Sequence, residues 1–269
     1  MKIGVFDSGL GGLIVLRALA RELQEYDYVY LGDTARVPYG NRSEEAIHRF
    51  LVEAVDFLFR EGCALVIVAC NTASAEALRK VQRGWLPRHY PDRRVLGVII
   101  PTAEAALEGK RGKERVKRLG ILATQGTVAS KAYEREVGKL DPRVRVVQSA
   151  APLLVPLIEN GGAKWAEPML REYLAPLIKA RVDAVVLGCT HYPILKRKIR
   201  MLAGVPVVAQ DECVPAKVRD YLARHPEMDR RLSKHGTVRL LVTDITRSAA
   251  ALARRWFGRK ARLEKVKID

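Results

Sequence analysis

Two cysteines of this 269-residue chain, Cys70 and Cys189, each follow a short apolar run. Residues 66–69 (VIVA) precede the first cysteine, and residues 185–188 (VVLG) precede the second. Runs of this length, rich in β-branched residues, are typical of buried strands rather than of helices. Because ligands of open α/β sheets bind beyond the carboxyl ends of the strands, both thiols are predicted to reach a ligand crevice.

A pair of reactive thiols needs partners, since an ordinary cysteine is mostly protonated at neutral pH. His191 lies two residues from Cys189, and Asp7 could serve Cys70 if the strands before them are neighbours. Two opposed thiols could remove a proton from one face of a carbon and return one to the other face, which inverts a stereocentre without a cofactor. From the residues alone, the alternative that both cysteines are structural stays open.

The remaining cysteines, Cys63 and Cys213, are interpreted as small buried hydrophobic residues. Four cysteines in a chain of this length are not a disulfide framework, and the CxxC spacing of structural zinc sites is absent. We predict neither a metal nor a cofactor. No apolar run is long enough to span a membrane and no signal peptide is recognisable, so we expect a cytoplasmic protein without membrane association.

The chain carries a formal net charge of +17, with 48% hydrophobic and 29% charged residues, which predicts a soluble globular protein. A basic surface attracts nucleic acids, but the clusters at 110–113 (KRGK) and 196–198 (KRK) come without an RNA- or DNA-binding motif. We therefore favour a solvated basic surface over a nucleic-acid partner. An arginine-rich composition with few asparagines is also typical of thermophiles.

Strands and helices are predicted to alternate, which indicates parallel sheets flanked by helices. The expected strands are 2–6, 28–31, 64–69, 95–100, 118–123, 143–147, 182–187, 205–208, 238–242 and 262–267. Helices are expected near 13–23, 44–58, from 101 onward, 127–138, 165–180, 213–223 and 247–257, with a surface loop at 109–113. A first lobe is expected to end near residue 98.

Residues 7–12 (DSGLGG) form a loop between the first strand and the first helix. With Asp33 at the end of the next strand, this order would suit a dinucleotide. However, the third glycine of the GxGxxG fingerprint would fall at Ile14, and Asp7 would place a negative charge where a pyrophosphate binds. The free N–H groups of a helix N-terminus, with Ser8 as an extra donor, would instead suit a carboxylate.

Five motifs together resemble the glutamate racemases of the cofactor-independent aspartate/glutamate racemase superfamily. They are 6–12 (FDSGLGG), 38–40 (PYG), 69–73 (ACNTA), 155–159 (VPLIE) and 187–193 (LGCTHYP). The resemblance implies an α/β fold of two pseudo-symmetric lobes with mainly parallel sheets flanked by helices, and an active site in the cleft between the lobes. It also implies a first lobe at 1–98, to which 210–269 returns, and a second lobe at 99–209.

The resemblance also implies the roles of individual residues. Cys70 and Cys189 would be the two acid/base residues, assisted by Asp7 and His191, with Glu159 also near the site. Substrate binding would fall to Asp7, Ser8, Tyr39, Gly40, Asn71, Thr72, Thr190 and His191.

Simpler interpretations of some of these residues stay open. Tyr39 and Gly40 could be turn residues, Thr72 a helix N-cap, and Glu159 a surface carboxylate. Residues 210–213 (QDEC) depart from the Asp-Ser-type turn that the resemblance leads us to expect.

The implied function is the interconversion of L- and D-glutamate by thiolate/thiol proton transfer at Cα, which would supply D-glutamate for peptidoglycan. Aspartate and hydantoin racemases share the two-cysteine plan, and the DSGLGG and CTHYP versions of the motifs favour glutamate. The family also permits a homodimer and regulation by a cell-wall precursor. A nucleic-acid-binding protein is the alternative from another class, and the net charge is its only support.

Overall fold

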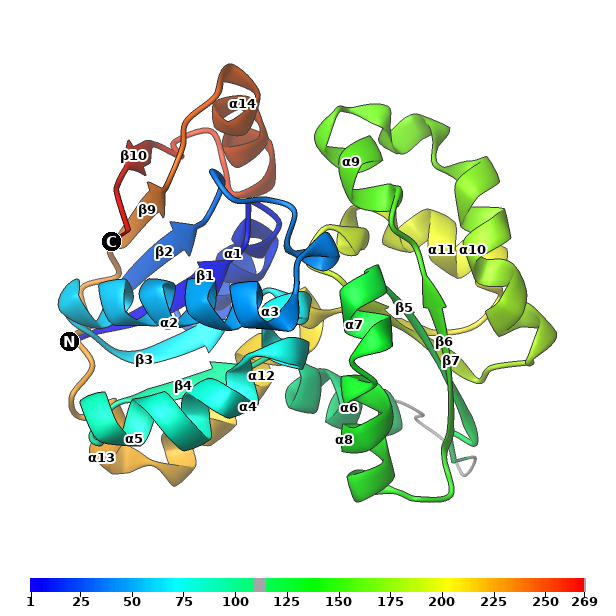
Figure 1. The fold of residues 1–269 in the computed structure, drawn as a ribbon, viewed down its shortest axis with the longest axis horizontal. Coiled ribbons are helices and arrows are strands. Elements are labelled where there is room, and N and C mark those ends of the chain that lie inside the picture. Colours follow the sequence, from blue (N-terminus) through cyan, green and yellow to red (C-terminus); the bar gives the residue numbers. More distant parts are fainter. Residues whose placement is uncertain (109–114, 269) are drawn as a thin grey trace.

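The computed structural model, which describes residues 1–108 and 115–268, has two parallel β-sheets, each flanked by helices (Figure 1). The larger sheet has the strand order β10-β9-β2-β1-β3-β4, and the smaller sheet has the order β6-β5-β7-β8. The predicted α/β class with parallel sheets flanked by helices is therefore confirmed. The surface loop predicted at 109–113 lies outside the described residues.

The first lobe, as we call the elements around the larger sheet, comes from both ends of the chain, and both termini lie there (Figure 1). Its strands are β1 (Lys2–Asp7), β2 (Tyr28–Gly32), β3 (Cys63–Val68), β4 (Arg94–Gly97), β9 (Val238–Val242) and β10 (Leu263–Lys265). Its helices are α1 (Gly12–Glu22), η1 (Tyr39–Asn41), α2 (Glu44–Arg60), α3 (Asn71–Glu76), α4 (Leu78–Lys80), η2 (Val81–Trp85), α5 (Leu86–His89), α12 (Gln210–Arg224), α13 (Pro226–Asp229) and α14 (Arg247–Trp256).

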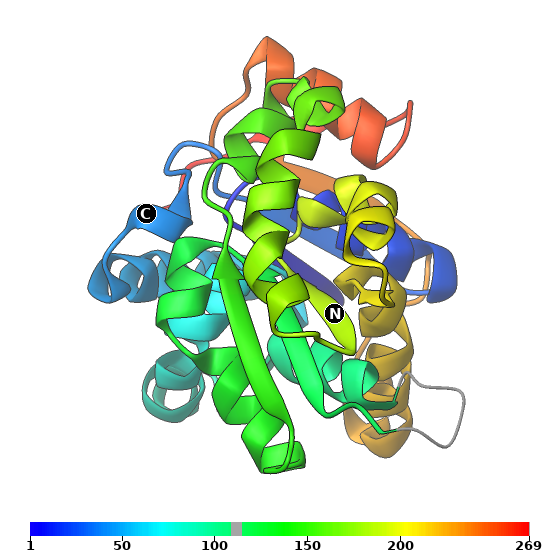
Figure 2. The same ribbon diagram turned by 90° about the vertical axis from the view of Figure 1, so that its right-hand side faces the viewer.

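The second lobe is built around the smaller sheet. Its strands are β5 (Arg118–Ala123), β6 (Arg145–Ala150), β7 (Ala184–Gly188) and β8 (Val207–Val208). Its helices are α6 (Ile99–Glu108), α7 (Gln125–Ala129), α8 (Ala132–Leu140), α9 (Leu154–Glu159), η3 (Gly162–Trp165), α10 (Glu167–Lys179), η4 (Tyr192–Leu195) and α11 (Lys196–Ala203). Figure 2 views this lobe from outside, with α10 lying across the smaller sheet. None of the described helices is long and apolar enough to cross a membrane.

The strands that lead to the two thiols are buried along their whole length. Every residue of β3 and of β7 is buried, which explains why both runs are apolar without alternation. β3 lies between β1 and β4, and β7 lies between β5 and β8. Since β1 and β3 are parallel and pair Phe6 with Val68, their ends bring Asp7 and Cys70 to the same edge of the sheet.

Some predicted boundaries are wrong for local reasons. The strand predicted at 95–100 ends at Gly97, and α6 already begins at Ile99. Proline is tolerated in the first turn of a helix, where its missing N–H would have no partner, so Pro101 does not have to open α6. The helix predicted at 127–138 is divided into α7 and α8 at Lys131, which has a φ of 53°.

Candidate active site

A cavity of about 210 Å³ lies between the lobes, and both Cys70 and Cys189 line it. The other predicted site residues in its wall are Ser8, Tyr39, Gly40, Asn71, Thr72, Glu159, Thr190 and His191. Asp7 is the exception, because it is fully buried behind the wall. The structure thus brings together in one place residues from five distant stretches of the chain.

Cys70 is the N-cap of α3 and belongs to the first lobe. Its Sγ donates a hydrogen bond to Ser8 Oγ at 3.4 Å and accepts one from the Ala73 amide at 3.5 Å. Burial and the nearby negative charge of Asp7 raise the pKa of Cys70 to about 12, although the hydrogen bonds with Ser8 and Ala73 act in the opposite direction. Cys70 therefore holds its proton at neutral pH in this arrangement.

Cys189 lies in the second lobe beside an imidazole. Its Sγ is 3.7 Å from His191 Nδ1, and His191 Nε2 is 2.8 Å from Glu159 Oε1. Burial by itself lowers the pKa of His191, but the hydrogen bonds to Cys189 and Glu159 and their negative charges outweigh it and raise the pKa to about 10. The interpretation of Glu159 as a mere surface carboxylate is wrong, since its carboxylate orients the ring of His191.

Asp7 joins the two lobes from beneath the cavity. Its carboxylate accepts hydrogen bonds from the Gly9 amide at 3.0 Å and from Thr190 Oγ1 at 3.3 Å. Burial raises the pKa of Asp7, while the positive charge of His191 opposes that shift. Among the described residues no hydrogen bond joins Asp7 to Cys70, so Asp7 acts on this thiol through its charge.

The glycine loop permits the close approach of the lobes. A Cβ atom at Gly11, just before α1, would collide with Thr190 Oγ1 and lie 2.6 Å from the His191 ring. A Cβ atom at Gly12 would lie 2.5 Å from that of Asp7. Gly11 is thus required so that the Cys189–His191 turn can pack against α1, and Gly12 leaves room for the side chain of Asp7.

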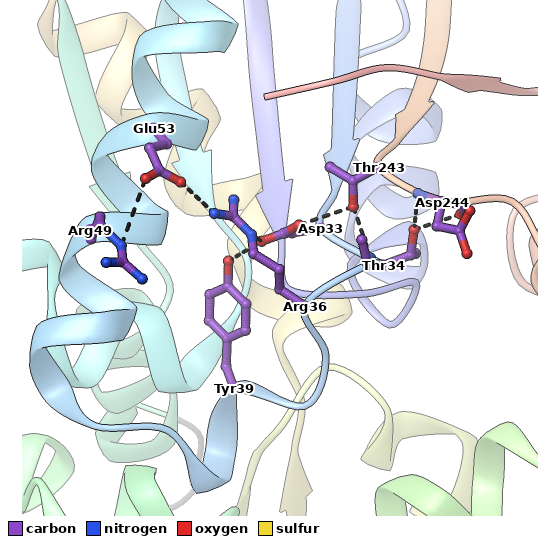
Figure 3. A network of polar contacts seen from close by, with 9 residues as sticks. Asp33, Thr34, Arg36, Tyr39, Arg49, Glu53, Thr243 and Asp244 are labelled. Carbon is purple, nitrogen blue, oxygen red and sulfur yellow. Dashed lines mark hydrogen bonds and ion pairs between the residues drawn. The ribbon is translucent and has the colours of Figure 1, made fainter. Parts of the chain in front are cut away.

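Tyr39 contributes its ring to the site and turns its hydroxyl away. The hydroxyl donates to Asp33 Oδ2 at 2.5 Å, and Asp33 also accepts hydrogen bonds from Arg36 Nε at 2.6 Å and from Thr243 at 3.0 Å (Figure 3). Arg36 is held in turn by Glu53. The network fastens the 33–40 loop to the returning C-terminal segment, which positions this wall of the cavity.

Thr72 and Gly40 face the second lobe. The interpretation of Thr72 as an N-cap is wrong, because Cys70 caps α3 and Thr72 lies in its first turn. Thr72 Oγ1 is 3.0 Å from Thr124 Oγ1, and a Cβ atom at Gly40 would lie 3.3 Å from that of Thr124. All three residues line the cavity, so these contacts join its walls from the two lobes.

In the sequence the 124–127 turn resembles another wall element of the site, but Thr124 is not counted there among the candidate residues. Thr124 follows β5, which lies beside β7, and it caps α7 by accepting a hydrogen bond from the Thr127 amide. Its position after a central parallel strand is the signal that could have identified it. The other lining residues that sequence reasoning left out are Gly9, Val37, Pro38, Asn41, Gln125, Pro152, Val155, Pro156 and Asn160.

The QDEC segment at 210–213 forms the first turn of α12 instead of a simple turn. Gln210 is fully buried, contacts Asn71 of the first lobe and donates a hydrogen bond to Leu187 O in the second lobe. Cys63 and Cys213 are both buried in apolar clusters outside the cavity. Within the described ranges, no group of three or more His, Cys, Asp or Glu side chains is arranged to hold a metal ion.

Comparison with known proteins identifies the family. The family model of the Asp/Glu/hydantoin racemases matches residues 3–214. The chain belongs to the Asp/Glu/hydantoin racemase family. It is 42% identical to the glutamate racemase of Dinoroseobacter shibae, over 85% of this chain and 86% of that protein. The family resemblance of the five motifs is confirmed.

Solved structures of family members share the fold. The glutamate racemase isoform RacE1 from Bacillus anthracis superposes with a TM-score of 0.89 at 32% identity, covering 99% of this chain and 97% of the other. The glutamate racemase of Francisella tularensis in complex with D-glutamate gives a TM-score of 0.87 at 29% identity, covering 100% and 98%. The two-sheet arrangement described here is therefore that of these racemases.

Proposed function

We propose that this protein interconverts L-glutamate and D-glutamate by moving protons between the substrate Cα and two thiols, Cys70 and Cys189. The observation that carries the proposal is that one small cavity between the lobes is lined by a cysteine from each lobe. Its volume of about 210 Å³ suits a small metabolite. The relative from D. shibae is a glutamate racemase and the one from F. tularensis was solved with D-glutamate, which supports glutamate as the substrate.

The different surroundings of the thiols suggest their roles. With L-glutamate, Cys189 removes the Cα proton, and the C–H electron pair stays on the substrate. Cys70, which holds its proton, then donates it to the opposite face and becomes a thiolate. With D-glutamate the two thiols exchange roles. His191 stabilises a negative charge on Cys189, and hydrogen-bond donors in the wall stabilise the charge that develops on the substrate carboxylate.

In this proposal the proton transfer needs no cofactor, and the product would supply D-glutamate for peptidoglycan in the cytoplasm. A homodimer remains a prediction that sedimentation equilibrium would test. A nucleic-acid partner finds little support, because Lys196 is paired with Glu212 and Lys198 donates to two backbone carbonyls. Retention of duplex DNA on a filter at low salt, lost steeply as salt rises, would revive that alternative.

Solvent exchange tests the two-thiol mechanism. L-glutamate turned over in deuterium oxide should yield D-glutamate with deuterium at Cα, while the remaining L-pool initially keeps its hydrogen. This follows because Cys189 retains the proton that it removes, whereas Cys70 has already exchanged with solvent. Early and equal labelling of both pools would indicate a single base. Inversion of L-aspartate but not of L-glutamate in the same assay would overturn the substrate assignment.

A further inference from the structure

We infer that Gln210 and Tyr133 are positioning residues that hold the side-chain amide of Asn71 with its N–H donors toward the active-site cavity. Asn71 lines the cavity, and neither Gln210 nor Tyr133 does. Gln210 begins α12, and Tyr133 lies on α8 of the second lobe. The inference rests on the proposed function for the identity of the ligand group, a carboxylate of the substrate.

A backbone carbonyl fixes the orientation of Gln210. Gln210 Nε2 donates to Leu187 O at 2.6 Å, and this carbonyl can only accept. If the amide were turned around, Gln210 Oε1 would face Leu187 O, and two acceptors would be in contact. The same nitrogen lies 3.1 Å from Asn71 Oδ1, so Gln210 presents a donor to Asn71.

Tyr133 supplies a second donor to the same oxygen. Its hydroxyl donates to Asn71 Oδ1 at 2.8 Å, and both Tyr133 and Gln210 are fully buried. Burial raises the pKa of Tyr133, so the phenol keeps the proton that it donates. A reversed amide of Asn71 would bring its N–H donors against the N–H donors of Gln210 Nε2, and it would lose the hydrogen bond that the Tyr133 hydroxyl donates to Oδ1.

The other end of the amide is therefore left for a ligand. Asn71 is 2% exposed, and its Nδ2 has no hydrogen-bond partner in the part of the chain that the structure describes. A buried donor without a partner is unfavourable until an acceptor arrives. A carboxylate oxygen is the acceptor that the proposed substrate offers, whereas a reversed amide would present Oδ1 and repel it.

The arrangement also links the two thiols. Asn71 directly follows Cys70, and Leu187 lies in β7 two residues before Cys189. Gln210 is hydrogen-bonded to both Asn71 and Leu187. One buried side chain therefore connects β7, the strand that leads to Cys189, with the amide donor beside Cys70.

Kinetics of Gln210→Leu, Tyr133→Phe and the double variant test the inference. In the double variant we expect KM for L-glutamate to rise about tenfold, as for loss of one hydrogen bond to a charged group, with kcat changed less than about twofold. In an Asn71→Ala background the same substitutions should have no further effect on KM. An unchanged KM in the double variant, or an equal rise in the Asn71→Ala background, would overturn the inference.

A second measurement needs no substrate. The side-chain amide resonances of Asn71, assigned by their loss in Asn71→Asp, should shift in both single variants of ¹⁵N-labelled protein. The amide of Asn160, which donates to Pro156 O at 2.8 Å, serves as the matched control and should not move. Unchanged Asn71 resonances would overturn the inference. If the wild-type protein did not racemise glutamate, the proposed function would fail while this spectrum still decided the role of Gln210 and Tyr133.

Discussion

Cys70 and Cys189 follow corresponding strands of the two sheets, yet their neighbours differ in charge. β3 and β7 are each the second strand from one edge of a parallel sheet. Cys70 has a serine hydroxyl, a backbone amide and the negative charge of Asp7 nearby. Cys189 has an imidazole that is held by Glu159. Both thiols thus follow a strand next to the edge strand of a parallel sheet, whereas the charged groups around the two thiols differ.

This difference shows how a pseudo-symmetric scaffold can serve an asymmetric task. A two-base reaction needs one thiol protonated and the other ionised before each turnover. Burial and the negative charge of Asp7 raise the pKa of Cys70, whereas His191, with its pKa raised to about 10, lies beside Cys189. In the proposed reaction the parallel sheets provide the positions of the two thiols, and the loop residues provide the charges that make their surroundings different.

The largest effect is expected from removing either thiol. Cys70→Ala and Cys189→Ala should each lower racemisation by at least about 10³-fold, because acid/base groups contribute on the order of 10²–10⁴-fold each. The fold should persist, since a methyl group replaces a small side chain at the cavity wall. The circular dichroism of glutamate, followed over time, measures the rate.

Cys63→Ala and Cys213→Ala are matched controls outside the cavity and should keep most of the activity. Loss of activity in these controls alone would show that Cys63 and Cys213, and not Cys70 and Cys189, are the reacting thiols.

A smaller but still large effect is expected from Gly11→Ala. The new methyl group would meet Thr190 and His191, so the turn that carries Cys189 must move away from α1. A displacement of about 1 Å at a reacting group can cost about 10²-fold in rate. Gly84→Ala is the matched control, because no atom lies within 4 Å of a Cβ there, and it should keep full activity. Wild-type kcat/KM in Gly11→Ala would show that the lobe contact does not position Cys189.

The pH profile separates the two halves of the site. Glu159 raises the pKa of His191, so Glu159→Gln should lower it, and His191 should then lose its proton at lower pH. The alkaline limb of kcat/KM, which in the wild type includes a group with a pKa of about 10, should move down by about one pH unit. The limb belongs to coupled groups rather than to one residue.

The control for this profile is Glu212→Gln, which removes a carboxylate that pairs with Lys196 outside the cavity wall. Its profile should match that of the wild type between pH 6 and pH 11. If Glu159→Gln and Glu212→Gln behaved alike, the contrast between the two thiols would lose its electrostatic basis.

Much of this site was accessible from the sequence because strand ends are easy to recognise. The apolar runs before Cys70 and Cys189, and the strand before Asp7, predicted which side chains share a sheet edge. The motif at 38–40 identifies Tyr39, but no local pattern indicates that its hydroxyl turns toward Asp33. The carboxylate that accepts this hydroxyl is also bonded by Thr243, which is distant in sequence and follows β9.

The residues that sequence reasoning missed act across the junction of the lobes. In the sequence, Gln210 belongs to a segment that departs from an expected turn. None of the residues next to it in the sequence indicates that its side chain contacts Asn71 or Leu187. The turn of Thr124 resembles a wall element already in the sequence, but its contact with Thr72 depends on the packing of the two lobes, which no local pattern encodes. The thermophile interpretation of the composition stays a prediction that a thermal unfolding curve would test.

The smallest effect on catalysis is expected from Tyr39→Phe. This substitution tests whether the hydroxyl of Tyr39 contributes to substrate binding or only its ring does. The hydroxyl already donates to Asp33, so kcat and KM should change by less than about twofold. The free energy of unfolding should fall by about 1–2 kcal/mol, because buried Asp33 loses one donor but keeps Arg36 and Thr243. Denaturant unfolding measures this change.

Tyr26→Phe is the matched control, since its hydroxyl donates to Asp229 at 2.5 Å outside the cavity wall. A rise in KM in Tyr39→Phe but not in Tyr26→Phe would show that the Tyr39 hydroxyl leaves Asp33 to bind the substrate, and the first lobe would then contribute a mobile donor beside Cys70.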